Sequence, residues 1–152
     1  MTIEEVKRRL ESLWQRNEAL QRGYERLERM QDQIESAGGF TLSDMPKNKS
    51  PLPDRKTALI AKKIDYEKEL SGFAEKLQND CAALEADIKQ LDNINERDVL
   101  IYRYVDFELW EDICFIFFGD SVDYEQKHDS YSRRLRRYHK SAIEHLVQIW
   151  QP

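Results

Sequence analysis

The sequence has little glycine and proline: its 152 residues include five glycines and four prolines. This scarcity, with 35% charged and 40% hydrophobic residues, favours long helices and argues against a β-sandwich, a β-barrel or a disordered chain. No glycine-rich turn is available to cradle a phosphate, which argues against a nucleotide-binding α/β fold. We therefore predict an all-α protein.

Cysteine and long apolar segments are also scarce. The two isolated cysteines, Cys81 and Cys114, do not make a disulfide framework, and Cys81 is expected to be a small core residue. The longest apolar run, residues 113–118, is too short to span a bilayer, and the N-terminus lacks the layout of a signal peptide. We expect a cytoplasmic protein without a membrane partner.

Charge is distributed unevenly along the chain. The net charge of −5 comes from 24 basic and 29 acidic residues, and at first it argues against nucleic acid as a partner. Residues 94–129, however, contain 3 basic and 10 acidic side chains, whereas residues 130–152 contain 5 basic and 1 acidic. A basic C-terminal element beside an acidic block needs an explanation that the overall charge does not provide.

The first 36 residues are predicted to form one helix with a coiled-coil pattern. The heptad d positions are all aliphatic: Val6, Leu13, Leu20, Leu27 and Ile34. The a positions include polar breaks: Ile3, Leu10, Asn17, Tyr24 and Gln31. Thr2 and Glu5 fit a capping box, and Gly38 with Gly39 is the expected stop. Gly23 is a position where a bend or fray is expected.

Residues 38–54 are rich in proline, glycine, serine and asparagine and are predicted to be a linker. A second long helix is expected over about 54–92. It repeats apolar residues at heptad spacing: Leu70, Ala74, Leu77, Cys81, Leu84, Ile88 and Leu91. Residues 1–92 would form a helical arm. An antiparallel hairpin within one chain and a dimeric coiled coil both fit this pattern.

Residues 93–152 are predicted to be a second domain of three shorter helices, at about 95–105, 108–118 and 130–149. Asn93 and Asn95 mark the first break, Gly119 ends the second helix, and Asp129 or Ser130 is expected to cap the third. The expected core includes Trp110, Ile113, Phe117 and Phe118. Three helices with a turn before the last have the outline of a helix-turn-helix unit.

The last helix is predicted to have one apolar stripe and one basic face. At about 100° per residue, the stripe contains Tyr131, Leu135, Tyr138, Ala142, Leu146 and Ile149. The basic face contains Arg133, Arg136, Arg137 and Lys140, and Arg134 flanks it. Val147 shares that side near the C-terminal end, so the basic face belongs to the first half of the helix. A helix face that is merely solvated would carry both basic and acidic side chains, whereas Glu144 is the only acidic residue in residues 130–152.

A DNA major groove accepts a single helix, and arginines can grip phosphates or pair with guanine edges. We therefore interpret these five cations as DNA-binding residues. Metal and catalytic sites are not expected. His128, His139, His145 and Cys114 lack zinc-ligand spacing, and Glu108, Glu111, Asp112 and Asp120 have no accompanying nucleophile. We expect neither an enzyme nor a bound cofactor.

Three segments resemble region four of bacterial sigma factors: residues 95–105 (NERDVLIYRYV), 108–114 (ELWEDIC) and 137–146 (RYHKSAIEHL). With the N-terminal helical arm and Met45-Pro46, the chain is similar to phage and prophage transcription regulators of the RinA and ArpU type. Two features depart from the pattern. Phe107 stands where the family usually has glycine, and residues 119–129 lengthen the turn, so that a longer final helix capped by Ser121 is an alternative.

The resemblance implies a sequence-specific transcription regulator of phage or prophage origin that binds double-stranded DNA. It also implies contact with RNA polymerase, and the arm would allow a homodimer. The chain is too short to carry the rest of a sigma factor, so we expect regulation rather than replacement of one. The alternative is a helical oligomeric scaffold, such as a small terminase-like DNA-packaging protein, in which the coiled coil is the functional part.

Overall fold

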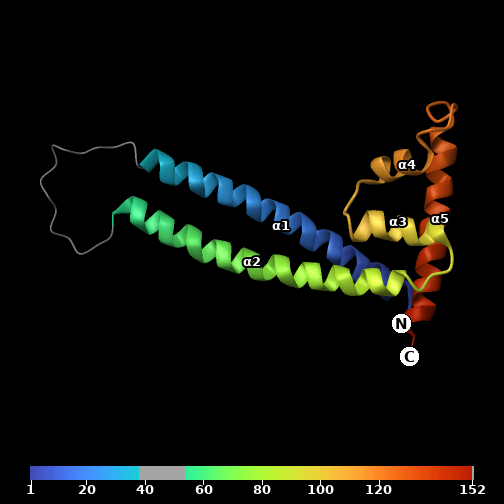
Figure 1. Cartoon of the computed structure of the whole chain (residues 1–152), viewed down its shortest axis with the longest axis horizontal. Coiled ribbons are helices and arrows are strands. Elements are labelled where there is room, and N and C mark those ends of the chain that lie inside the picture. The colour runs from blue at the N-terminus through green and yellow to red at the C-terminus, as the bar shows by residue number, and fades with distance from the viewer. Residues whose placement is uncertain (38–53, 152) are drawn as a thin grey trace, which may run out of the picture. The chain divides into compact units, whose positions relative to one another are not determined.

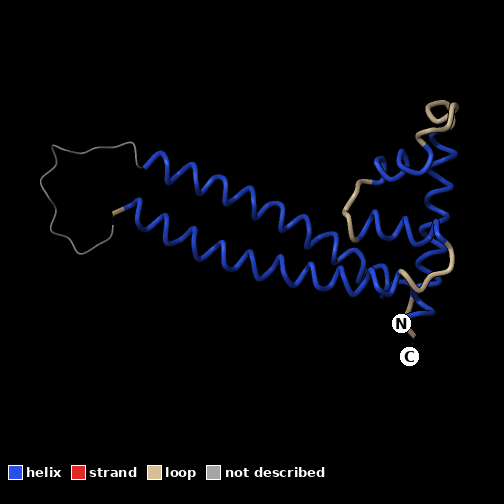
Figure 2. Tube along the Cα trace, viewed as in Figure 1, coloured by secondary structure: helices blue, strands red, loops and turns tan. Residues whose placement is uncertain are grey.

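The computed structural model describes residues 1–37 and 54–151, and its regular elements are helices joined by loops (Figures 1 and 2). These helices are α1 (Ile3–Ala37), α2 (Arg55–Ile88), α3 (Ile94–Tyr104), α4 (Trp110–Phe118) and α5 (His128–Trp150). The described ranges contain no strand, which confirms the predicted all-α fold. None of the described helices is long and apolar enough to cross a membrane.

The starts of both long helices are capped by side chains. The Glu5 backbone N–H donates to Thr2 Oγ1 (3.2 Å) and the Thr2 N–H donates to Glu5 Oε2 (2.7 Å), so the predicted capping box is confirmed. These hydrogen bonds lower the pKa of Glu5. Asp54 caps α2 by accepting from the Thr57 N–H (2.7 Å). The predicted stop at Gly38-Gly39 and the linker up to residue 53 lie outside the described residues.

Some predicted helix ends are wrong by a few residues. α2 ends at Ile88 instead of residue 92: residues 89–90 form a turn, and Leu91, which continues the apolar repeat and is buried, follows that turn. α5 begins at His128, and Lys127 precedes it without a side-chain cap, so neither Asp129 nor Ser130 is the cap. Gly119 ends α4 as predicted, with its N–H donating to the Phe115 carbonyl (2.7 Å).

The chain divides into two compact units. The core unit comprises Met1–Asn17 and Leu77–Pro152, and the hairpin unit comprises Glu18–Lys76. The core unit therefore contains the first turns of α1 and the last turns of α2 together with α3, α4 and α5. It also contains all of the largest fully buried side chains: Val6, Leu10, Ile88, Val99, Leu100, Ile113, Ile143 and Leu146.

In the hairpin unit, α1 and α2 lie side by side and run antiparallel (Figure 1). Lys63 Nζ donates to Gln31 Oε1 (2.8 Å), and Gly23 faces Leu70, so residue numbers rise along α1 as they fall along α2. α1 is continuous at Gly23, so the chain does not fray there. A Cβ at this position would lie 2.5 Å from Leu70 Cδ1. Glycine thus permits the close approach of the two helices.

In the core unit, the ends of the long helices pack with the C-terminal helices. The Cys81 thiol is buried and lies 3.8 Å from the Tyr104 carbonyl oxygen, so Cys81 is a core residue as predicted. Burial raises its pKa. The Trp150 indole N–H donates to Asp87 Oδ2 (2.8 Å), and the Arg9 guanidinium lies 4.1 Å from the Trp150 ring centre. These contacts hold the C-terminal end of α5.

Candidate nucleic-acid interface

α5 is held in the core unit by five buried side chains: Leu135, Ala142, Ile143, Leu146 and Val147. Three residues of the predicted apolar stripe are buried: Leu135, Ala142 and Leu146. The other three, Tyr131, Tyr138 and Ile149, are only half-buried. Ile143 and Val147 extend the buried side around the C-terminal half of the helix. An exposed basic face is therefore available in the first half, where the sequence places it.

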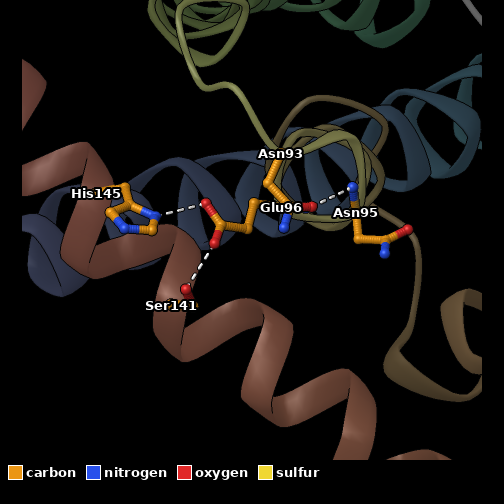
Figure 3. Close-up of polar contacts among 5 residues, drawn as sticks. All are labelled: Asn93, Asn95, Glu96, Ser141 and His145. Atoms are coloured by element: carbon orange, nitrogen blue, oxygen red, sulfur yellow. Dashed lines mark hydrogen bonds and ion pairs between the residues drawn. The ribbon is translucent and has the colours of Figure 1, made fainter.

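A buried carboxylate joins α3 to α5 (Figure 3). Glu96 is 4% exposed, and its carboxylate accepts from Ser141 Oγ (2.6 Å) and lies 2.7 Å from His145 Nδ1. Asn93 Oδ1 accepts from the backbone N–H groups of Asn95 (2.8 Å) and Glu96 (3.3 Å), which caps α3. Because burial of a carboxylate is costly without partners, these contacts constrain the rotation of α5. No pattern in the sequence predicted this cluster, because its members are 45 and 49 positions apart.

A second contact to α5 involves His139. Its Nε2 is hydrogen-bonded to the Tyr104 hydroxyl (2.8 Å), and its ring meets Trp110 edge to face, with centroids 4.9 Å apart. Burial, followed by the positive charge of Arg103, lowers the pKa of His139 to about 4. Burial also raises the pKa of Tyr104 to about 12. Both groups are therefore neutral near pH 7. Trp110 is half-buried, whereas the prediction placed it in the core.

All five predicted DNA-binding cations are exposed on α5: Arg133, Arg134, Arg136, Arg137 and Lys140. Three of them line one open surface hollow of about 520 Å³, together with Ser130: Arg133, Arg136 and Arg137. The Arg133 Nε also donates to the Asp129 carbonyl (3.3 Å). The basic face thus brings guanidinium groups of successive turns around a single concave site.

Arg134 has a different environment from these three. Its Nε donates to the Tyr138 hydroxyl (2.9 Å), and its guanidinium carbon lies 5.5 Å from the Phe118 ring centre. Helical geometry places position 134 on the opposite flank of α5 from position 136. Arg134 is therefore an exposed cation in contact with Phe118 at the end of α4 and Tyr138 on α5, beside the basic face and not within it.

The turn between α4 and α5 comprises residues 119–127. This is longer than the three or four residues of a usual helix-turn-helix connection. The Tyr131 hydroxyl donates to Asp123 Oδ1 (2.6 Å), which lowers the pKa of Asp123, and Lys127 pairs with Asp123 (3.3 Å). The Tyr124 ring stacks on Tyr131. The segment is a series of turns, so the alternative helix capped by Ser121 is wrong.

The connection between α3 and α4 depends on Phe107. Its φ of 56° lies in the left-handed region that favours glycine, and no other non-glycine residue among those described has a positive φ. The Phe107 ring contacts Trp14 (centroids 6.0 Å apart), and Arg103 Nη1 donates to the Glu108 carbonyl (3.1 Å). These contacts stabilise a backbone conformation that phenylalanine seldom adopts.

Over the described ranges, no group of three or more histidine, cysteine or acidic side chains is placed to hold a metal ion. Comparisons with known proteins found no match to the chain among protein-family models, curated proteins or solved structures. A proposal for function therefore depends on the geometry and charge of α5 and its surroundings.

Proposed function

We propose that the chain is a sequence-specific DNA-binding transcription regulator in which α5 is the recognition helix. The observation that supports this proposal is the exposed basic face in the first half of α5, opposite side chains that are buried in the core unit. A recognition helix presents its N-terminal residues to base edges in the major groove. Arg133, Arg136 and Arg137 are in that half, and Lys140 follows one turn later.

The connections around α4 add support. Phe107 departs from the glycine usual in sigma region four, but its φ is positive, a conformation that glycine adopts readily, and this supports the resemblance. On this basis we extend the proposal to a cytoplasmic phage or prophage regulator that contacts RNA polymerase and forms a homodimer through the helical arm. The long turn before α5 distinguishes the chain from a simple helix-turn-helix.

The individual cations have different proposed roles. Arg133 and either Arg136 or Arg137 are proposed to read bases, because they lie nearest the start of α5. Lys140 is proposed to bind a phosphate, as a flexible point charge farther along the helix. Arg134 is proposed to bind a phosphate on the flank while Tyr138 orients its guanidinium.

The test is selection of bound duplexes from a random DNA pool, followed by affinity measurements over a range of salt concentrations. If four phosphates are neutralised, log affinity falls with log salt at a slope of about −3.6. Alanine at a phosphate-binding residue flattens that slope by about 0.9 and weakens all sequences alike. Alanine at a base-reading residue costs about 1–3 kcal/mol and relaxes preference at one base pair.

A quadruple variant, with alanine at 133, 136, 137 and 140, is expected to remain folded and lose DNA binding. The matched control replaces four exposed cations of the long helices with alanine: Arg22, Arg29, Lys62 and Lys68. Equal binding by the parent and the quadruple α5 variant at every salt concentration would contradict the proposal. In that case the oligomeric scaffold becomes the better hypothesis.

A further inference from the structure

The outer side of α4 exposes large apolar side chains. Leu109 is 59% exposed, Phe115 62% and Ile116 50%, whereas the opposite side of the helix is buried through Ile113, Cys114 and Phe118. At about 100° per residue, positions 109, 112 and 116 follow one side of the helix, position 115 lies next to 112, and position 111 lies at the far edge, next to 115. We call this surface the α4 outer face: Leu109, Glu111, Asp112, Phe115 and Ile116.

On this surface the adjacent residues Phe115 and Ile116 are exposed together, and the Phe115 ring is held in place by the fold. Single exposed apolar residues are common on proteins, but contiguous apolar patches rimmed by polar groups mark interaction sites. The Phe115 ring meets Tyr124 edge to face, with centroids 5.8 Å apart. It also covers Gly119, where a Cβ would lie 2.7 Å from Phe115 Cδ2. The ring is therefore positioned by the fold while most of the residue stays exposed to solvent.

The polar groups on this surface are acidic. Glu111 and Asp112 are both exposed in the first turn of α4. Carboxylates there also interact favourably with the helix dipole, which accounts for the acids but not for the three apolar neighbours. The charged side chains on this face, Glu111 and Asp112, are both negative, so they repel DNA and anionic lipid alike. It is complementary to a basic, apolar surface of a protein.

We propose that the α4 outer face binds a short amphipathic helix of a partner protein, in which lysine or arginine residues flank apolar ones. The nine residues of α4 span about 13 Å, which matches two to three turns of a packed helix rather than a broad globular surface. Apolar side chains at helical spacing provide the ridge for such packing, and the two carboxylates select basic neighbours. The proposal goes beyond DNA binding and uses none of the α5 cations.

The experiment selects binders to the full-length protein from a displayed library of helical peptides. Enriched peptides are expected to share apolar residues at i, i+3 and i+4 together with lysine or arginine. For the best peptide, Ile116→Ser and Asp112→Lys are each expected to weaken binding by about tenfold or more. Raising the salt concentration should reduce the effect of Asp112→Lys, because exposed charges are screened.

Two matched variants control for general effects of apolar loss and charge reversal. Ile94→Ser removes an exposed isoleucine from α3 (62% exposed, against 50% for Ile116), and Asp92→Lys reverses an exposed acid before that helix; neither should change binding. Amide chemical shifts of the parent protein should change around residues 109–116 on peptide addition. The proposal is overturned if no peptide is enriched, if enriched peptides lack the basic, apolar pattern, or if they bind the Ile116 variant as tightly as the parent.

Discussion

At the residue scale, the buried Glu96 and the half-buried His139 stabilise α5 in different ways. Both carboxylate oxygens of Glu96 have partners on α5, Ser141 and His145, so its burial is compensated. His139 has one hydrogen bond, to the Tyr104 hydroxyl, and lies near the positive charge of Arg103. None of these contacts places a carboxylate beside His139. The positive charge gained when His139 is protonated is therefore not compensated there, and the α3–α5 contact is sensitive to acid.

We expect acidification from pH 7 to pH 5 to destabilise the folded protein through His139. Its pKa of about 4 lies below the value of 6.5 in the unfolded chain, so the unfolded state binds more protons in this window. The stabilisation is fully present above pH 6.5 and is lost as pH falls toward 4. The loss at pH 5 is at most about 2 kcal/mol. Urea unfolding at both pH values measures it.

The variant His139→Gln should show a smaller difference in stability between pH 7 and pH 5. His128→Gln is the matched control, since it removes a histidine from the first turn of the same helix and should leave the difference unchanged. An undiminished pH effect in His139→Gln would show that other groups cause it.

At the scale of helices, close packing in the hairpin unit depends on one glycine. Gly23→Ala is expected to lower stability by about 1 kcal/mol, because overpacking against Leu70 and the Tyr66 hydroxyl outweighs the gain in helix propensity. Gly72→Ala makes the same change in α2, where no atom lies within 4 Å of the new Cβ. It should raise stability by about 0.5–1 kcal/mol.

Thermal unfolding followed by circular dichroism compares these two variants with the parent. Opposite shifts of the midpoint are expected from the same chemical change. Stabilisation by both variants would mean that Leu70 moves aside at little cost and that the helices do not require glycine at position 23.

The helices were largely predictable from the sequence, because local patterns specify them. Heptad repeats predicted α1 and α2, and Asn93 and Gly119 marked real boundaries. The end of α2 was missed because Leu91 obeys the same apolar repeat although it lies beyond the end of the helix. The start of α5 was missed because a tertiary hydrogen bond, between Tyr131 and Asp123, organises the preceding turn.

The candidate site was predictable in part. The exposure of Arg133, Arg136 and Arg137 follows from helical periodicity alone. The contact of Ser141 with Glu96 joins residues 45 positions apart, and no local pattern specifies such a pairing. The hydrogen bond from Arg134 to Tyr138 depends on side-chain rotamers, which the sequence pattern does not determine.

At the scale of the whole molecule, the largest fully buried side chains among the described residues belong to the core unit, and none lies in the described parts of Glu18–Lys76. We expect amide hydrogen exchange in the full-length protein to be slowest around Val99, Ile113 and Ile143, and faster throughout the hairpin unit. Local opening requires less free energy where few apolar side chains are enclosed. Equal protection in both units would indicate that the chain unfolds as a single cooperative body.

The core unit is assembled from two segments that are distant in sequence, and this affects the order of events on the ribosome. Residues 18–76 are synthesised between those segments, which takes roughly 3–12 s at typical rates. Val6 and Leu10, fully buried in the finished fold, stay exposed on the nascent chain throughout this interval. The hairpin unit is continuous in sequence and can pair first. Chaperones that shield apolar segments during translation would therefore find their target in the first turns of α1.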